Sequence, residues 1–181
     1  MSIEKLIAAI PSQSKAQREQ MRVNAGSRLV SGTHAQQADA AAMLAALDAL
    51  ETREHDGFLG EMKGMEVAER IYRAFTDLPM TDTDAKVLQA LLDNPGSSSG
   101  QLSTVCGWKD KSWHLHFGNM CERRRDYLPA VAVYGDDDTP FWSGIFADLE
   151  QGEHPWTWTM KPDVAAALAR LGVRAKRAAR A

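Results

Sequence analysis

LSTVCGWKDKSWHLHFGNMCERRR, residues 102–125, is the stretch that decides the fold of this chain. Gly107 is placed to end one helix in the left-handed conformation that glycine tolerates, and a short turn leads to a second helix from about Ser112 to Asp126. The apolar residues of that second helix recur at spacings of three and four, which indicates one buried side. The residues expected on this side, together with Leu128, are Trp113, Phe117, Met120 and Cys121.

Two further helices are predicted before this turn. Thr81 and Asp84 resemble a capping box, with Asp in place of the usual Glu or Gln, and they open a helix that Asn94–Gly96 close. Ser98 is placed to cap a short helix that follows. The residues expected on the inward side of the first helix are Val87, Leu88, Leu91 and Leu92. Three short helices in this order and spacing predict a helix-turn-helix.

The residues after Pro129 predict a small β-hairpin or wing. Ala130–Tyr134 and Phe141–Ala147 are β-like and flank the turn sequence GDDDTP at 135–140. In Trp156–Met160, large apolar side chains alternate with threonine, so one face of that strand is apolar. We interpret these segments together as the wing of a winged helix-turn-helix.

The domain boundaries follow from the apolar pattern and from the glycines. Residues 1–54 predict an N-terminal helical region, and residues 55–64, which hold three glycines, predict a linker. Residues 65–173 predict the winged helix-turn-helix domain with a leading helix, and residues 174–181 a basic tail. Two stripes of apolar residues at helical spacing support these helices. The first consists of Ala40, Met43, Leu44, Leu47 and Leu50, and the second of Met65, Ala68, Ile71, Tyr72, Phe75 and Leu78. The expected fold class is mainly α with a small antiparallel β-hairpin.

The composition is that of a globular protein without a membrane span. Of the 181 residues, 44% are apolar and 25% are charged, and no apolar run approaches the roughly 20 residues of a membrane helix. The apolar stretch near the N-terminus is too short for a secretory signal. Cys106 and Cys121 are the two cysteines, which suits reduced thiols better than a disulfide scaffold. We expect a cytoplasmic protein that does not bind membranes.

The distribution of charge matters more than the net charge of -3. A negative total is unfavourable for DNA binding, because Lys and Arg that neutralise phosphates supply most of the non-specific affinity. Residues 102–135, however, carry five basic and three acidic side chains, and residues 170–181 carry five basic and no acidic ones. Residues 136–169 carry one basic and seven acidic side chains. The triplet Asp136–Asp138 therefore argues against insertion of a wing tip into the minor groove.

The outward side of the 112–126 helix carries residues suited to DNA. A helical wheel places Leu115, Gly118, Asn119 and Glu122 on that side, with His114 on one flank and His116 on the other. Asn can bond an adenine edge, and glycine lets the backbone approach the duplex. Gly118 also has a structural alternative, which is relief of crowding against the preceding helix. Arg123 and Arg125 flank this side and are expected to contact phosphates.

The N-terminal end of the same helix predicts a phosphate contact, because backbone amides and basic side chains meet there. The wheel places Arg124 toward the core side, where it is expected to be structural and either to snorkel or to pair with a carboxylate such as Glu122 or Asp126. The tail has two interpretations, a source of non-specific phosphate attraction or a solvated chain end, and its basic residues are Arg174, Lys176, Arg177 and Arg180. The predicted DNA-binding residues are Lys109, Lys111, Ser112, His114, Gly118, Asn119, Arg123 and Arg125.

Metal and catalytic alternatives are weaker. Four residues of metal-ligand type lie close in sequence: Cys106, His114, His116 and Cys121. The two histidines, at i and i+2 of one helix, point in different directions, and the second cysteine lies on the core side. Asp56, Glu61 and Lys63 resemble the carboxylates and lysine of metal-dependent nucleases, but no strand presents them. No phosphate loop or nucleophile triad is present. We predict no catalytic residue, metal or cofactor.

Two segments carry a resemblance to a known family. In residues 102–124 a glycine turn is followed by a Leu-His-aromatic-Gly pattern, here Leu115–Gly118, and by a basic helix end. In FWSGIFADLEQGEHPWTWTMKPDVAAALARLGV, residues 141–173, a Trp-x-Trp strand leads through Met and Pro into a helix that closes on Leu-Gly. Residues 81–173 thus resemble a bacterial winged-helix module that occurs beside HNH-type restriction nucleases. The resemblance implies recognition of DNA, and the absence of the nuclease implies recognition without cleavage.

Two functions of different class follow. The first is a non-enzymatic duplex DNA-binding protein, either a transcription regulator or the recognition component of a defence or mobile-element system. The second is a protein-interaction factor, an inhibitor or adaptor that docks a protein partner on the winged helix, and the net negative charge favours it. An enzyme is the weakest hypothesis. The N-terminal helices can pack on the winged helix or build a homodimer, and symmetric DNA sites follow only from the homodimer.

Overall fold

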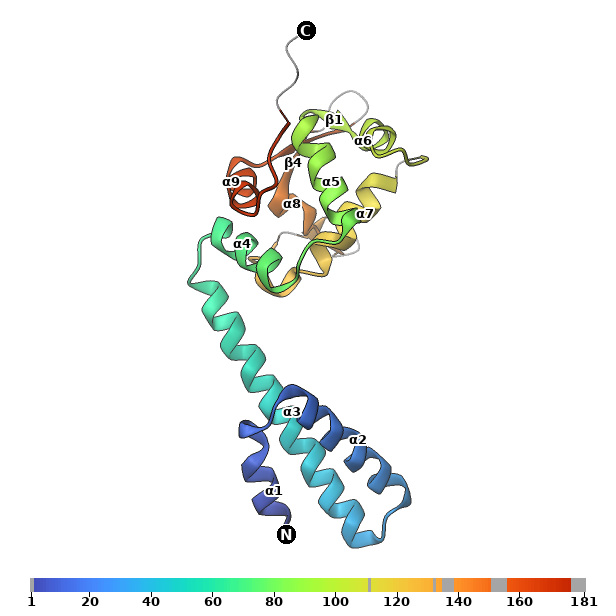
Figure 1. Cartoon of the computed structure of the whole chain (residues 1–181), viewed down its shortest axis with the longest axis vertical. Helices are drawn as coiled ribbons and strands as arrows, with labels where there is room; N and C mark the ends of the chain where they lie inside the picture. Colours follow the sequence, from blue (N-terminus) through green and yellow to red (C-terminus); the bar gives the residue numbers. More distant parts are fainter. Residues whose placement is uncertain (1, 111, 132, 135–138, 151–155, 177–181) are drawn as a thin grey trace. The chain divides into compact units, whose positions relative to one another are not determined.

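The computed structural model describes residues 2–110, 112–131, 133–134, 139–150 and 156–176 (Figure 1). The chain divides into two compact units, Met1–Gly60 and Glu61–Ala181. Most of the described residues are helical, and the short strands pair only in antiparallel fashion. This agrees with the predicted mainly α fold with a small hairpin. No helix of the described part of the chain is long and apolar enough to cross a membrane.

The first unit is a small helical assembly with its own core. Its elements are α1 (Ile3–Ala9), a 3-10 turn (Ile10–Ser12), α2 (Lys15–Ser31) and the first part of α3 (His34–Lys63). Ser14 and Gln17 form a capping box that fixes the start of α2. The buried cluster consists of Ile10, Ala25, Ala40, Met43, Leu47 and Leu50, and Ile3, Leu6 and Ile7 of α1 pack against it. The predicted α3 stripe is therefore covered inside this unit.

The segment predicted as a linker, residues 55–64, has helical backbone as far as Lys63. Gly57 and Gly60 lie within α3, where each costs about 1 kcal/mol relative to Ala. Good helix formers surround them, and Met62 is 1% exposed, so packing favours the helix over a loop. The predicted linker thus has a helical backbone, and the boundary between the two units lies within it, at Gly60.

The second unit holds the remaining helices and all the strands. The helices are α4 (Val67–Asp77), α5 (Asp82–Asp93), α6 (Ser99–Val105), α7 (Ser112–Glu122), a 3-10 turn (Arg125–Tyr127), α8 (Ser143–Phe146) and α9 (Pro162–Arg170). The strands are β1 (Ser97–Ser98), β2 (Val133–Tyr134), β3 (Thr139–Pro140), β4 (Ala147–Glu150) and β5 (Thr157–Met160). Helix α9 packs against α4 (Figure 1), and Arg170 forms an ion pair with Glu69 across that contact.

Local capping signals set the helix ends as predicted. The side chains of Thr81 and Asp84 form a reciprocal capping box at the start of α5. Ser98 and Gln101 do the same for α6. Gly107, with φ +67°, ends α6 in the left-handed conformation that favours glycine. The turn from α6 to α7 is therefore fixed by local chemistry.

The strands form two separate sheets. β4 and β5 form a hairpin, and β5 also pairs with β1, which gives the order β1-β5-β4. β2 pairs with β3 in a second, two-stranded sheet. The predicted single wing over residues 130–160 is thus wrong in detail. Asp136–Asp138 follow β2 in sequence rather than joining β4 to β5, and these three residues lie outside the described part of the chain.

Residues 141–147, predicted as a strand, contain the helical turn α8. The turn places Phe146 in the core, where its ring contacts the rings of Phe75 and Phe117 at centroid distances of 6.1 and 6.2 Å. Burial of these aromatic side chains outweighs the β-propensity of the segment. The strand begins only at Ala147, which pairs with Met160.

Candidate nucleic-acid interface

One side of α7 is fully buried and holds the helix to α5 and α6. Trp113, Phe117, Met120 and Cys121 are each 0% exposed, as the sequence predicted. The Trp113 backbone N–H donates to Ser103 Oγ at 3.0 Å, and its indole Nε1 donates to the Val87 carbonyl at 3.1 Å. The Trp113 ring stacks on Phe117 at a centroid distance of 4.7 Å. These contacts fix both the position and the rotation of α7.

The chain after α7 is held by a buried ionic network. Arg124 is 2% exposed, donates to the carbonyls of Met120 and Leu78, and lies 3.1 Å from Asp84 Oδ2. Its guanidinium carbon is 4.1 Å from the centroid of the Phe75 ring. Arg123 Nη2 lies 2.5 Å from the other carboxylate oxygen of Asp84. Arg124 is therefore structural, as predicted.

The partner of Arg124 differs from the prediction. Neither Glu122 nor Asp126 reaches it, because α7 ends at Glu122 and the chain turns there. The predicted helix end at Asp126 is also wrong, because α7 ends four residues earlier.

Burial alone raises the pKa of the Asp84 carboxyl. Hydrogen bonds from Arg123 and the Thr81 backbone, together with the charge of Arg124, lower this pKa by more than burial raises it. The pKa of Asp84 is therefore below its usual value.

The opposite side of α7 is open to solvent. His114, Leu115 and Asn119 are exposed, and Leu115 retains 60% of its accessible surface. A Cβ added at Gly118 meets no atom within 4 Å, so relief of crowding does not explain this glycine. The outward side therefore combines hydrogen-bonding groups, an apolar side chain and a position without a side chain.

A groove of about 360 Å³ runs beside this outward side. From α7 it is lined by His114, Leu115, Gly118, Asn119 and Glu122, from residues 140–143 by Pro140, Phe141, Trp142 and Ser143, and from β5 by Trp158. Three of the predicted DNA-binding residues thus meet in one groove. Its other wall, residues 140–143, carries no signal in the sequence beyond its aromatic content.

The N-terminal end of α7 gathers cationic groups from two elements. Lys109 is exposed and precedes α7, and the Ser112 hydroxyl donates to the Lys109 carbonyl at 3.0 Å. Lys86 of α5 lies over the Trp108 ring, with Nζ 5.5 Å from the centroid, and the His116 ring lies 4.5 Å from the same ring. The sequence did not indicate Lys86. Lys111, also predicted here, lies outside the described residues.

The arginines at the C-terminal end of α7 are accompanied by carboxylates. The side chain of Arg123 is 52% exposed, but its guanidinium already forms an ion pair with Asp84. The Arg125 side chain is 61% exposed, and its Nε lies 3.7 Å from Asp126 Oδ1. Arg123, Arg125, Glu122, Asp126 and Asn119 line one shallow depression. At this end, the carboxylates of Asp84, Glu122 and Asp126 therefore compete with a phosphate for the arginines.

No family model, curated protein or solved structure matches this chain. The chemistry of the interface has to follow from its own residues. Those residues form two groups, at the two ends of α7, with the groove between them along the outward side.

The cysteines and histidines that suggested a metal site lie apart. Cys106 and Cys121 are free and buried, and burial raises the pKa of the Cys106 thiol and raises that of Cys121 well above its ordinary value. His114 and His116 are both exposed. No group of three metal-ligating side chains occurs among the residues that the structure describes.

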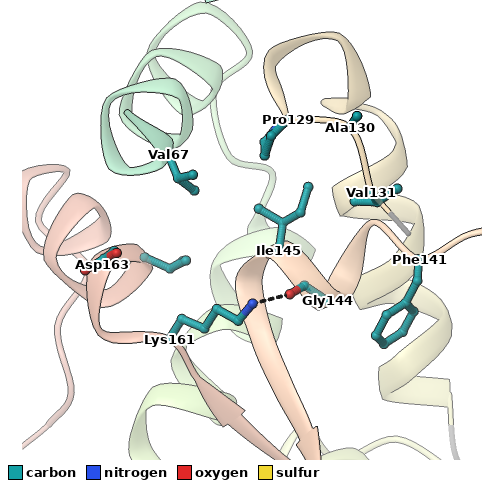
Figure 2. A pocket seen from close by; sticks show the side chains of 10 residues that line it. Val67, Pro129, Ala130, Val131, Phe141, Gly144, Ile145, Lys161 and Asp163 are labelled. Carbon is teal, nitrogen blue, oxygen red and sulfur yellow. Dashed lines mark hydrogen bonds between the residues drawn. The ribbon is translucent and has the colours of Figure 1, made fainter. Parts of the chain in front are cut away.

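A second cleft, of about 420 Å³, lies between α4, α8 and α9 (Figure 2). Its lining is mostly apolar, with Val67, Val131 and Ile145 around the opening. Lys161 Nζ donates to the Gly144 carbonyl at 2.6 Å (Figure 2). The same ammonium lies 3.6 Å from the Asp148 carboxylate. Because this ammonium is already paired and Asp163 also faces the cleft, the cleft is unsuited to phosphate.

Proposed function

We propose that residues 81–173 form a winged helix that binds duplex DNA, with α7 as the recognition helix in the major groove. The observation that carries the proposal is the division of α7 into a fully buried side and an open side with hydrogen-bonding groups. A recognition helix needs such a division, because one side must be held rigidly while the other meets the base edges.

The chain order supports the same proposal. α5, β1, α6 and α7 follow one another, and the hairpin β4–β5 adds to β1 through β5. In this arrangement α5 and α6 support α7 (Figure 1), and the hairpin is the candidate wing. The sequence resemblance of residues 81–173 to a winged-helix module points in the same direction.

The described cations favour phosphate contacts at the N-terminal end of α7. Lys86 and Lys109 lie there, together with the first turn of α7, whose amides attract anions. Asn119 and His114 on the outward side are suited to base edges. Recognition without catalysis fits a transcription regulator, or a defence or mobile-element component whose nuclease is another chain.

A salt titration of the full chain on a labelled duplex tests the proposal. If two or three cations engage phosphates, a plot of log affinity against log salt concentration has a slope of about -2 to -3. The measurement is fluorescence polarisation between low and physiological salt. Absence of binding at low salt would overturn the proposal.

A pair of matched substitutions assigns the binding to α7. Asn119→Asp adds one negative charge to the outward side without a change of size, and we expect it to weaken duplex binding by about tenfold. Asn24→Asp makes the same change on exposed α2 of the first unit and should leave affinity unchanged. Equal losses in both variants would mean that binding does not depend on α7.

A protein partner is the second candidate function. Leu115 on the outward side is largely exposed, and the carboxylates of Glu122 and Asp126 lie with Arg123 and Arg125 in the depression at the end of α7. An exposed apolar residue bordered by mixed charges is typical of a protein docking surface. Under this alternative, Leu115→Ala abolishes capture of the partner, whereas duplex DNA does not bind at any salt concentration.

A homodimer through the N-terminal helices is also a proposal. The homodimer was inferred from two apolar stripes. The stripe on α3 is buried within the first unit, and Ile71 and Phe75 of the stripe on α4 are buried within the second. These stripes therefore give the homodimer no support. Sedimentation of the full chain tests it, and a monomer predicts asymmetric DNA sites.

A further inference from the structure

The groove beside α7 has walls of two different chemical kinds. Phe141 and Trp142 form the wall opposite α7, and Trp158, which is 7% exposed, lies deeper. The Phe141 and Trp158 ring centroids are 6.1 Å apart with an interplanar angle of 40°. Trp158 Nε1 donates to Ser99 Oγ at 3.0 Å, so this indole is fixed in place. This side of the groove therefore offers aromatic surface.

The α7 wall offers polar groups at the edge of that aromatic surface. Asn119 presents an amide, which is both donor and acceptor, and Glu122 presents a carboxylate, which accepts. Among the described residues, neither side chain has a hydrogen-bonding partner in the chain. Gly118, between them and His114, leaves one position of this wall without a side chain.

We propose that this groove binds a single nucleobase displaced from the stack of the duplex. The inference rests on the proposed DNA-binding function and names its substrate class, which is DNA with an unpaired or mispaired base. A base combines a flat π-face with donors and acceptors at its edge. The aromatic wall of the groove suits the face of the base, and the polar wall suits its edge.

Other ligand classes fit less well. A phosphate group would meet the Glu122 carboxylate, which repels it. An aliphatic side chain of a protein would leave the Asn119 amide without a partner. A base that remains stacked in the duplex presents only its groove edge and cannot lie against Phe141 or Trp142. Displacement from the stack is therefore part of the proposal, and it is easiest for a base that has no pairing partner.

The test compares two labelled duplexes of the same sequence, one fully paired and one with a single extra, unpaired cytosine. The full chain should bind the second duplex about tenfold more tightly at equal salt, because the unpaired base can enter the groove without the free-energy cost of breaking a base pair. The measured quantity is the ratio of the two affinities. A ratio of one with a steep salt dependence overturns the groove proposal and leaves DNA binding intact, whereas no binding of either duplex overturns both.

Variants locate the effect. Trp142→Leu should bring the ratio close to one, whereas Phe58→Leu, which changes a half-buried aromatic side chain of the first unit, should preserve it. Glu122→Ala changes an exposed side chain that the fold does not use, and it should also lower the ratio by removing the acceptor for the cytosine amino group. A ratio that survives both Trp142→Leu and Glu122→Ala means that the groove is not the site.

Discussion

The two ends of α7 are held by different chemistry. At the N-terminal end, a neutral hydrogen bond joins the Trp113 backbone to the Ser103 hydroxyl. At the C-terminal end, the buried Arg124 guanidinium joins Asp84, Phe75 and the carbonyl groups of Met120, Leu78 and Pro79. Both anchors fix the helix, but only the second uses charged side chains. The neutral anchor leaves the nearby lysines available.

This difference shows that charge counted along the sequence is not charge available at a surface. The three consecutive arginines, 123–125, give the strongest basic cluster of the α7 region. In the fold they are accompanied by three carboxylates, those of Asp84, Glu122 and Asp126. The other end gains Lys86 from α5, and Asp110 is the acidic residue next to Lys109 in the sequence. The N-terminal end is thus the more cationic of the two.

The largest effect is expected at the ionic anchor. Arg124→Met should lower the free energy of unfolding by about 3–5 kcal/mol, because it leaves the buried Asp84 carboxylate with one partner fewer. Arg123→Met removes the exposed partner of the same carboxylate and should cost about 1 kcal/mol or less. Urea denaturation of both variants measures the difference. Equal losses would show that Arg124 is not the structural member of the pair.

The neutral anchor should respond less strongly. Ser103→Ala removes the acceptor of the buried Trp113 N–H, and an unsatisfied buried donor costs about 1–3 kcal/mol. Thr104→Ala changes the neighbouring exposed hydroxyl of α6 and serves as the control, with a smaller expected loss. The same urea denaturation applies. A Ser103→Ala protein as stable as the parent would remove the distinction between the two ends.

The parts of the fold that depend on near neighbours could be predicted from the sequence. Thr81 with Asp84, and Ser98 for the following helix, specify helix starts within one turn of chain. The buried side of α7 follows from its spacing, and so does the inward position of Arg124. The groove-facing positions of His114, Gly118 and Asn119 follow from the same helical wheel.

The parts that depend on distant residues could not. The same Asp84 that caps α5 also binds Arg124, forty residues later, and no local pattern indicates that second role. The helical turn at 143–146 depends on the cavity that Phe75 and Phe117 leave for Phe146. Lys86 and the aromatic wall of the groove come to α7 through tertiary packing, which a single sequence does not state.

Acid should weaken the ionic anchor before the neutral one. The pKa of Asp84 is below its usual value in the folded chain, so its stabilising contribution is complete above about pH 4 and is lost as the pH falls through the lower, folded value. Unfolding free energies between pH 6 and pH 2 should therefore fall more steeply for the parent than for Asp84→Asn. Parallel pH curves for the two proteins would contradict the assigned role of this carboxylate.

The smallest effect is expected in the salt dependence of DNA binding, and it compares the two ends directly. Lys109→Ala should reduce the magnitude of the slope of log affinity against log salt by about 0.9, the value for one phosphate contact. Arg125→Ala should change the slope much less, because Glu122 and Asp126 lie beside Arg125 and oppose a phosphate there. Both positions are exposed, so neither variant should alter the unfolding free energy appreciably. A larger change for Arg125→Ala than for Lys109→Ala would place the phosphate contacts at the C-terminal end, and the carboxylates there would then have to be displaced by DNA.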